Sequence, residues 1–364
     1  MTSRWLDRVQ SLARDALPTA VFRYVEEGAR EEITVHEAAA AWQSVRVLPR
    51  VLQDVRTVST ATELMGRPFS LPFGVAPMTL QRAADPEGEV AMARAAAGAG
   101  VPLVVSSNAG RTFADIAETG VTWWVQAYLA EDRREALPLL EAAVDAGAAA
   151  VVLTVDAPVL GTRYRSPDGP WVWEMAEADW LGANVSGTAS GLDPSSRGKA
   201  MDLGPADIRW LHEVTGLPVA VKGVLRADDA RTCAEAGAAA VWVSNHGGRQ
   251  LDRALATARC VQAVRAGAGD DVEVYVDGGV RSGLDVLLAV ALGADAAFLG
   301  RPMFHALAAG GAQGAGRALA ELGTEMVEAM RLSGCSTLAA ARGIACPDGG
   351  FTPKSGSDLR EPPV

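Results

Sequence analysis

The chain has 364 residues, of which 49% are hydrophobic and 38 are glycine, so it can form a sizeable buried core with many turns. Its 33 basic and 44 acidic residues give a net charge of -11, which argues against nucleic-acid or membrane partners held by a general positive field. No uncharged apolar run is long enough to span a bilayer, and the first residues lack the apolar core of a signal peptide.

The chain has 4 cysteines, which show no CxxC spacing and fall in helix-like or tail segments. This pattern gives little support for disulfides or for zinc, so we expect no metal site. A reducing compartment fits best, and we expect a cytoplasmic protein.

Residues 1–65 are mostly helical in periodicity, and eight short apolar runs of β type follow them. Alanine-rich segments with helical periodicity separate most of the runs, which gives the strand and helix alternation of a parallel sheet. Eight such units in about 250 residues favour a closed (β/α)₈ TIM barrel, of class α/β, over a doubly wound sheet. The runs are 73–76, 102–105, 122–126, 150–155, 218–222, 239–243, 272–276 and 296–299, and the helical segments are Gly88 to Ala99, Asp132 to Ala146, Ala227 to Ala236 and Ser282 to Leu292.

We expect one domain over residues 1–364, with the barrel at 66–345 and a tail at 346–364. Residues 161–205 interrupt the alternation between strands four and five and are rich in Gly, Ser and Trp. We interpret them as a lid-like insertion over the barrel mouth. Its tryptophans pack the lid onto the scaffold or cap a hydrophobic substrate. They are Trp171, Trp173 and Trp180.

Each apolar run ends in polar residues, and in this fold the carboxyl ends of the strands meet at the active-site mouth. The seventh and eighth runs end in D-G-G-V-R, Asp277 to Arg281, and L-G-R-P, Leu299 to Pro302. Glycine backbone N–H groups at helix starts, together with two arginines, are typical of a barrel phosphate site. The alternative is that both motifs only make tight turns.

Lys222 follows the fifth run, so its ammonium would point into the mouth and stabilise negative charge on a bound ring. A lysine inside a barrel is costly unless it is used. The alternative is a structural salt bridge to an acid such as Asp277, and both roles can hold together.

The sixth run ends in S-N-H-G-G-R, which places His246 three residues before Arg249. One turn would bring both to the same side, as a base beside a carboxylate clamp. Asp156, after the fourth run, is a candidate to orient the imidazole. The other histidines, His36, His212 and His305, fall in helix-like segments.

These residues resemble the FMN-dependent α-hydroxy-acid oxidases and dehydrogenases. The resemblance covers nearly the whole chain in order, apart from residues 165–205 and the tail after Cys346. The motifs that carry it are P-F-G-V-A-P-M-T-L-Q, V-Q-A-Y, L-T-V-D-A-P-V-L-G-T-R, P-V-A-V-K-G-V, S-N-H-G-G-R-Q-L-D, V-D-G-G-V-R-S-G-L-D-V and L-G-R-P.

The resemblance implies FMN as cofactor, a small-molecule (S)-2-hydroxy acid as substrate, O₂ or another electron acceptor, and a homo-oligomer, expected to be a tetramer. It implies a base, His246, paired with Asp156, and a substrate carboxylate held by Tyr24, Arg163 and Arg249, with Tyr128 on the α-oxygen. The implied flavin contacts are Pro77, Met78, Thr79, Ser106, Gln126, Thr154, Lys222 and Ser244. The implied phosphate contacts are Asp277, Gly278, Gly279, Arg281, Gly300 and Arg301.

Oxidation of a 2-hydroxy acid needs a base, a cation clamp and an electron acceptor, and each role has a residue or a cofactor here. Asn108 stands where short-chain members have an aromatic side chain, which leaves room for a bulky or aryl substrate, whereas Thr79 mildly opposes this. Three alternatives remain: a dehydrogenase of the same family with another acceptor, an FMN-barrel isomerase or lyase, and a flavin-holding module without catalysis. Whether the α-hydrogen leaves as hydride or proton is open at this point.

Overall fold

The computed structural model of the chain describes residues 4–165, 180–184 and 199–346. Eight parallel strands close into a barrel in which each strand pairs with its neighbours in sequence, and β11 pairs back onto β4. The predicted (β/α)₈ barrel is therefore confirmed, and each strand falls within two residues of its apolar run. The strands are β4 Phe73–Val75, β5 Leu103–Val105, β6 Trp123–Ala127, β7 Val151–Thr154, β8 Val219–Val224, β9 Ala240–Val243, β10 Glu273–Val276 and β11 Ala296–Leu299.

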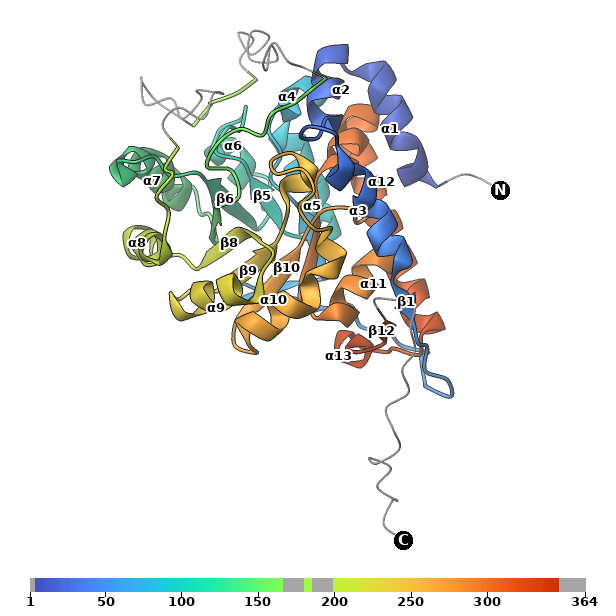
Figure 1. Cartoon of the computed structure of the whole chain (residues 1–364). Coiled ribbons are helices and arrows are strands. Elements are labelled where there is room, and N and C mark those ends of the chain that lie inside the picture. The colour runs from blue at the N-terminus through green and yellow to red at the C-terminus, as the bar shows by residue number, and fades with distance from the viewer. Residues whose placement is uncertain (1–3, 166–179, 185–198, 347–364) are drawn as a thin grey trace.

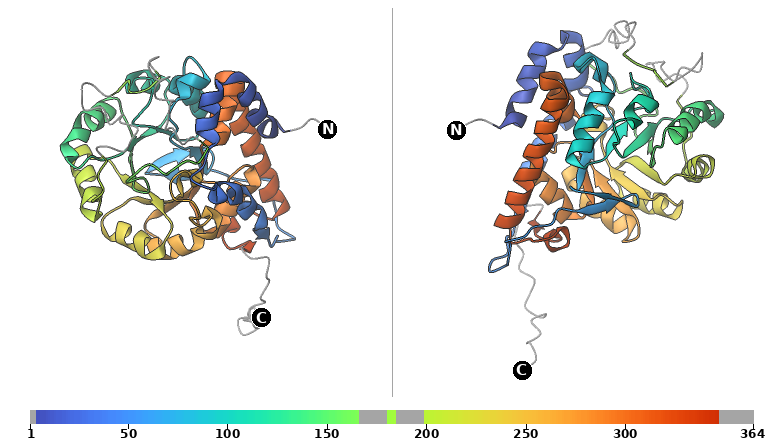
Figure 2. Two further views of the ribbon diagram at one scale, coloured as in Figure 1. Left: turned by 45° about the horizontal axis from the view of Figure 1, so that its top comes forward. Right: turned by 180° about the vertical axis from the view of Figure 1, so that it is seen from behind.

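Helices surround the strands as a ring (Figure 2). The segment 132–146 is not one helix, since a 3₁₀ turn, η1 Arg133–Ala136, precedes α7 Leu137–Asp145. Pro138 explains the break, because a residue without a backbone N–H fits only the first turn of a helix. The main ring helices are α5 Glu89–Ala99, α7, α8 Pro205–Thr215, α9 Ala227–Glu235, α10 Val261–Ala268, α11 Gly283–Leu292 and α12 Arg301–Leu332.

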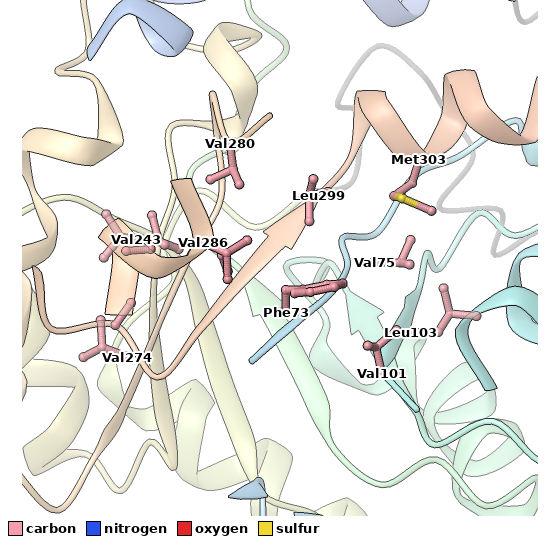
Figure 3. Close-up of a cluster of buried hydrophobic side chains, with 14 of the residues drawn as sticks. Phe73, Val75, Val101, Leu103, Val243, Val274, Val280, Val286, Leu299 and Met303 are labelled. Atoms are coloured by element: carbon pink, nitrogen blue, oxygen red, sulfur yellow. The ribbon is translucent and has the colours of Figure 1, made fainter. Parts of the chain in front are cut away.

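Alternate residues of each strand face two different cores, because successive side chains point to opposite faces of a sheet. Trp124, Trp242 and Phe298 fill the barrel interior, and the last two rings lie 4.2 Å apart between centroids. Their sequence neighbours, such as Val243 and Leu299, pack outward against the helices, together with Phe73 and other side chains drawn in Figure 3. Large aromatic rings thus fill the barrel and leave no central pore.

The amino end of the barrel is closed by a hairpin of β2 Thr62–Leu64 and β3 Arg67–Phe69. Its Leu64 and Met65 are buried in the interior core, and the Met65 backbone N–H donates to the Glu273 carboxylate at 3.0 Å. Since this end is plugged, the opening of the barrel lies at the carboxyl ends of the strands.

The N-terminal segment is helical only up to Ser44, in α1 Trp5–Ala16, α2 Thr19–Glu26 and α3 Ile33–Ser44. The expectation of helix up to residue 65 is wrong beyond that point, where the chain is extended and contains Pro49. Its β1 Arg46–Val47 pairs antiparallel with β12 Ala345–Cys346. Helix α1 lies along α12 (Figures 1 and 2), and the Trp5 indole N–H donates to the Gly314 carbonyl at 2.9 Å.

The insertion is described only in part. Trp180 packs against an apolar cluster that includes Leu80 and Phe304, as expected for a residue that joins the insertion to the scaffold. Trp171 and Trp173 lie outside the described residues, and the lid remains a prediction. Within the three described ranges, no helix has both the length and the apolar character needed to cross a membrane.

Candidate active site

A cavity opens at the carboxyl ends of the barrel strands, where the polar residues that end each apolar run come together. All but two of the predicted site residues line it. The two exceptions are Ser244, fully buried under the cavity floor, and Asp156, which lies behind His246. The predicted residues on the cavity wall are Tyr24, Pro77, Met78, Thr79, Ser106, Gln126, Tyr128, Thr154, Arg163, Lys222, His246, Arg249, Asp277, Gly278, Gly279, Arg281, Gly300 and Arg301.

Lys222, Ser244 and Asp277 form what we call the buried cluster, on three adjacent strands. The Lys222 ammonium donates to the Ser244 hydroxyl at 2.8 Å and lies 3.0 Å from an Asp277 carboxylate oxygen. The Ser244 hydroxyl in turn donates to the other Asp277 oxygen at 2.7 Å. The carboxylate faces Lys222, so the salt bridge that the sequence left open is present, and Asp277 also lines the cavity beside Gly278 and Gly279.

A bulge in β8 shapes the floor beside this cluster. The pairing of β8 with β9 shifts between Lys222 and Val224, and Gly223 has φ +118°. A Cβ on Gly223 would lie 2.6 Å from the Cβ of Asp156, so only glycine fits there. The sequence K-G-V therefore makes room for the Asp156 carboxylate.

His246 and Asp156 form a hydrogen-bonded pair, with Nδ1 of the imidazole 2.9 Å from a carboxylate oxygen. His246 has φ 56°, a left-handed conformation that is uncommon for a residue other than glycine, and its backbone N–H donates to the Ser244 hydroxyl at 3.1 Å. Burial alone would raise the pKa of Asp156, but the charge and hydrogen bond of His246, together with Lys222, lower it. The carboxylate is thus held ionised and leaves Nε2 as the ring nitrogen free for chemistry.

Two guanidiniums, of Arg163 and Arg249, stack on the Tyr24 ring, with their central carbons 5.3 and 4.7 Å from its centroid. Arg249 donates to the carbonyls of Tyr24, Val25 and Glu27, and Arg163 reaches two of these at 3.4 Å. Carbonyls at the carboxyl end of a helix lack partners within the helix and carry partial negative charge. Helix α2 therefore holds both cations at the cavity wall.

These two cations remain under electrostatic stress. Burial, followed by the charge of Arg249, lowers the pKa of Arg163 to about 10. Such a shift is expected where two like charges share a desolvated site. An anion between them would relieve the repulsion.

Arg281 and Arg301 line another part of the cavity wall. Beside them lie Gly278 and Gly279, which have positive φ angles of +84° and +87°. Burial, followed by the charges of Arg249 and Arg281, lowers the pKa of Arg301 to about 9. Its guanidinium donates to the Val25 and Gly247 carbonyls at 3.0 and 2.6 Å. Glycine backbone and crowded cations at a helix start suit a phosphate group.

The remaining polar wall comes from strands β5 to β7. The Gln126 amide donates to the Thr154 hydroxyl at 3.2 Å and accepts from the backbone N–H of Ser107 at the same distance. Burial, followed by the charge of Asp156, raises the pKa of Tyr128. Its phenol therefore stays protonated and can donate a hydrogen bond.

Two contributors to the site escaped the sequence analysis. One is the row of α2 carbonyls, which carries no signal in side-chain type. The other is Lys199, whose ammonium lies 3.9 Å above the Tyr128 ring centroid and lines the cavity. It lies near the end of the insertion, which lacks periodicity, so no pattern placed it near the site.

Comparison with known proteins shows matches over almost the full chain. The family model described as FMN-dependent dehydrogenase matches residues 13–344. An L-lactate oxidase from Nostoc sp. is 40% identical, covering 90% of this chain and 94% of the relative. A 4-hydroxymandelate oxidase from Amycolatopsis orientalis is 39% identical, covering 94% and 98%, and glycolate oxidase 5 from Oryza sativa is 39% identical, covering 91% and 92%.

Solved structures agree with this likeness. A crystal structure of mandelate oxidase superimposes with a TM-score of 0.86 at 38% identity, covering 94% of this chain and 98% of the other. A second, of mandelate oxidase with (S)-4-hydroxymandelic acid, gives a TM-score of 0.85 at 37% identity, covering 93% and 97%.

Proposed function

Because this chain belongs to the FMN-dependent dehydrogenase family, we propose that it oxidises an (S)-2-hydroxy acid to the 2-oxo acid and passes the electron pair to O₂. The observation that carries the proposal is the His246–Asp156 pair, 2.9 Å apart, on a cavity whose wall also holds Arg163 and Arg249. A base beside a double cation clamp suits a substrate that carries an ionised carboxylate next to the carbon to be oxidised. The relatives named as oxidases of lactate, 4-hydroxymandelate and glycolate support this reaction type.

FMN is the cofactor of the family, and the residues present fit it. Two crowded guanidiniums beside glycine backbone suit its phosphate, and the Lys222 ammonium suits negative charge on its ring system. When bound, FMN would supply the acceptor for the electron pair that leaves the substrate. We propose that it is held by Pro77, Met78, Thr79, Ser106, Gln126, Thr154, Lys222, Ser244, Asp277, Gly278, Gly279, Arg281, Gly300 and Arg301.

We propose that Nε2 of His246 is the atom that accepts a proton from the substrate. Nδ1 faces Asp156, so it carries a hydrogen in the resting imidazole, and Nε2 is left to accept a proton from the substrate. The Asp156 carboxylate then stabilises the imidazolium that forms.

The substrate carboxylate is proposed to lie between Arg163 and Arg249, which present planar, fork-shaped donors suited to bidentate pairing. Tyr24 lies beneath both guanidiniums, and stacking on its ring helps to fix their planes. Tyr128, kept protonated by its raised pKa, would donate to the α-oxygen of the substrate.

We propose that the cavity accepts a larger side chain than that of glycolate. Asn108 lines the cavity at a position where the family resemblance implies an aromatic residue in short-chain members, and the relative named 4-hydroxymandelate oxidase supports a bulky or aryl substituent. Thr79, which follows the neighbouring strand β4, also lines the wall and narrows the cavity.

Anaerobic mixing tests the proposal. FMN-loaded protein is combined with glycolate, L-lactate, (S)-mandelate and (S)-4-hydroxymandelate, and the flavin absorbance is followed. At least one acid should bleach the flavin, and air should then restore the colour with one H₂O₂ formed per 2-oxo acid. Bleaching without reoxidation by air would indicate another electron acceptor, and no bleaching by any acid would overturn the proposal.

We further propose one domain over residues 1–364, a cytoplasmic location and assembly as a homotetramer. The unpaired thiols of Cys233, Cys260 and Cys335 support a reducing compartment. Closed symmetric assemblies are common among soluble enzymes, and analytical ultracentrifugation of the FMN-loaded protein tests the tetramer.

A further inference from the structure

Lys199 is a cation of the cavity wall that the proposed mechanism does not use. Its backbone forms an antiparallel bridge with Ala130, and the next residue, Ala200, donates to the Leu129 carbonyl at 2.8 Å. These contacts fix Lys199 beside the chain that leaves β6 at Tyr128. The ammonium is therefore placed over the Tyr128 ring by the barrel scaffold itself.

The charge of Lys199 is not matched within the part of the chain that the structure describes. No hydrogen bond or ion pair from those residues reaches its ammonium, and its pKa is lowered, by burial first, although the charge of Asp156 opposes the shift. Asp156 is already hydrogen-bonded to His246. A half-buried ammonium without an anion is costly, so the site favours a ligand that brings one.

The carboxylate at the reacting end of a 2-hydroxy acid does not meet this need. That group is allotted to Arg163 and Arg249, which stack on Tyr24, whereas Lys199 stacks on Tyr128. The two kinds of cation therefore lie against different rings of the cavity wall. A substrate with one carboxylate would pair with Arg163 and Arg249. It would leave the Lys199 ammonium partly desolvated and without an anion.

The identity of the residue points the same way. Of the 33 basic residues in the chain, only Lys199, Lys222 and Lys354 are lysines. Arginine would stack on Tyr128 at least as well, but an ammonium concentrates its charge on one atom with three donors. In an arginine-rich chain, both lysines in the described ranges line the active-site cavity.

We propose that Lys199 binds an anionic group on the side chain of the substrate, so that the enzyme prefers a 2-hydroxydicarboxylate to the monocarboxylate of the same length. This inference rests on the proposed function, since it names the substrate class of that same site. The oxidation is unchanged: the substrate loses two electrons and two protons, and O₂ takes up both to form H₂O₂. Lys199 acts as a specificity residue on the part of the cavity wall formed by Tyr128.

The test compares (S)-2-hydroxyglutarate with (S)-2-hydroxypentanoate, which share a carbon chain and differ in the far group. Wild type should show a kcat/KM about 10- to 100-fold higher for the dicarboxylate, the range of one charge-assisted hydrogen bond. Lys199→Met should lose this preference, because kcat/KM falls much more for the dicarboxylate than for the monocarboxylate. Lys199→Arg should keep part of it. Arg209→Met, which removes a positive charge on exposed α8, should change neither value.

Three outcomes overturn the inference. One is a wild-type enzyme without a preference, and another is an equal loss for both acids in Lys199→Met, which would make Lys199 a residue that only positions Tyr128. The third is a difference in Kd between 2-oxoglutarate and 2-oxopentanoate that remains in Lys199→Met. Each Kd is measured by titrating the acid and following the change in the flavin spectrum. That titration needs no turnover, so it separates this inference from the proposed function, which fails only if no acid of the anaerobic panel bleaches the flavin.

Discussion

Two sets of charges in one cavity differ in how they are compensated. In the buried cluster, the Lys222 ammonium has both Ser244 and the Asp277 carboxylate within 3.0 Å, and the exposed fractions are 5%, 0% and 6%. At the rim, Arg163, Arg249 and Lys199, which we call the rim cations, rest on backbone carbonyls and aromatic rings. The first set is complete without a ligand, whereas the second is not.

This difference in compensation suits the two sets of charges to different functions. A charge matched inside the protein is held in one geometry and can stabilise a resident group such as a flavin ring at little reorganisation cost. A cationic side chain that contacts only carbonyl dipoles and ring faces keeps hydrogen-bond donors directed at the cavity. An incoming anion can then neutralise its charge. We therefore assign the buried cluster to the cofactor and the rim cations to the substrate.

The largest expected effect comes from His246, which lies between the two sets. His246→Ala should lower kcat by about 10³- to 10⁴-fold, because general base catalysis and the imidazolium paired with Asp156 are lost together. FMN should remain bound, since the buried cluster is untouched. Anaerobic stopped-flow measurement of flavin bleaching checks the rate, and loss of FMN from this variant would contradict the separation.

Lys222→Met tests the buried cluster. Removing one partner leaves the Asp277 carboxylate buried without a counter-charge, which should cost about 3–5 kcal/mol of unfolding free energy. Urea unfolding of the flavin-free protein measures this cost. The double variant Lys222→Met/Asp277→Asn is the matched control and should regain part of the loss, and equal stability of wild type and single variant would show that the pair is not compensated as described.

Arg249→Met tests the rim. We expect kcat/KM to fall about 10- to 100-fold through a raised KM, because charge-assisted hydrogen bonds to the substrate carboxylate are lost. Arg249→Lys should restore less than half of the loss in free energy, since a single ammonium cannot make a bidentate pair. A fall in kcat with KM unchanged would place Arg249 in the chemical step instead.

The smallest effect concerns Glu26, an acid near Arg301, one of the two arginines that we assign to the FMN phosphate. Burial alone would raise its pKa, but the ion pair with His305, 3.1 Å away, and the charge of Arg301 lower it from 4.5 to about 2. A carboxyl whose pKa is lower in the folded state stabilises the protein above its unfolded pKa. That contribution, present above about pH 4.5, is lost as the pH falls toward 2.

Glu26→Gln should therefore lower the unfolding free energy by about 1–2 kcal/mol at pH 6 and by much less at pH 3. Urea unfolding of both proteins at the two pH values measures the difference. Gln10, which donates to Glu26, offers the control Gln10→Ala, which should have a smaller pH-dependent effect. A destabilisation that is the same at both pH values would contradict the lowered pKa.

The barrel and most cavity residues follow from the sequence for a physical reason. A strand buried on both faces needs a continuous apolar run, and its polar end must lie at the mouth, so β9 and His246 could be predicted from the same ten residues. For Lys222 the sequence predicted the position and the possible partner Asp277, but it could not choose between the salt bridge and a contact with a bound ring, since both roles use the same position. The α2 carbonyls gave no signal because backbone groups are common to all residues, and Lys199 gave none because its segment lacks periodicity.

The most direct measurement is the binding of a 2-oxo monocarboxylate, such as pyruvate, to the FMN-loaded Arg163→Met/Arg249→Met variant, followed by the flavin spectrum. If the rim cations serve the substrate, Kd should rise about 100-fold or more while the FMN content equals that of wild type. An unchanged Kd, or a variant purified without its flavin, would contradict the division between cofactor and substrate charges.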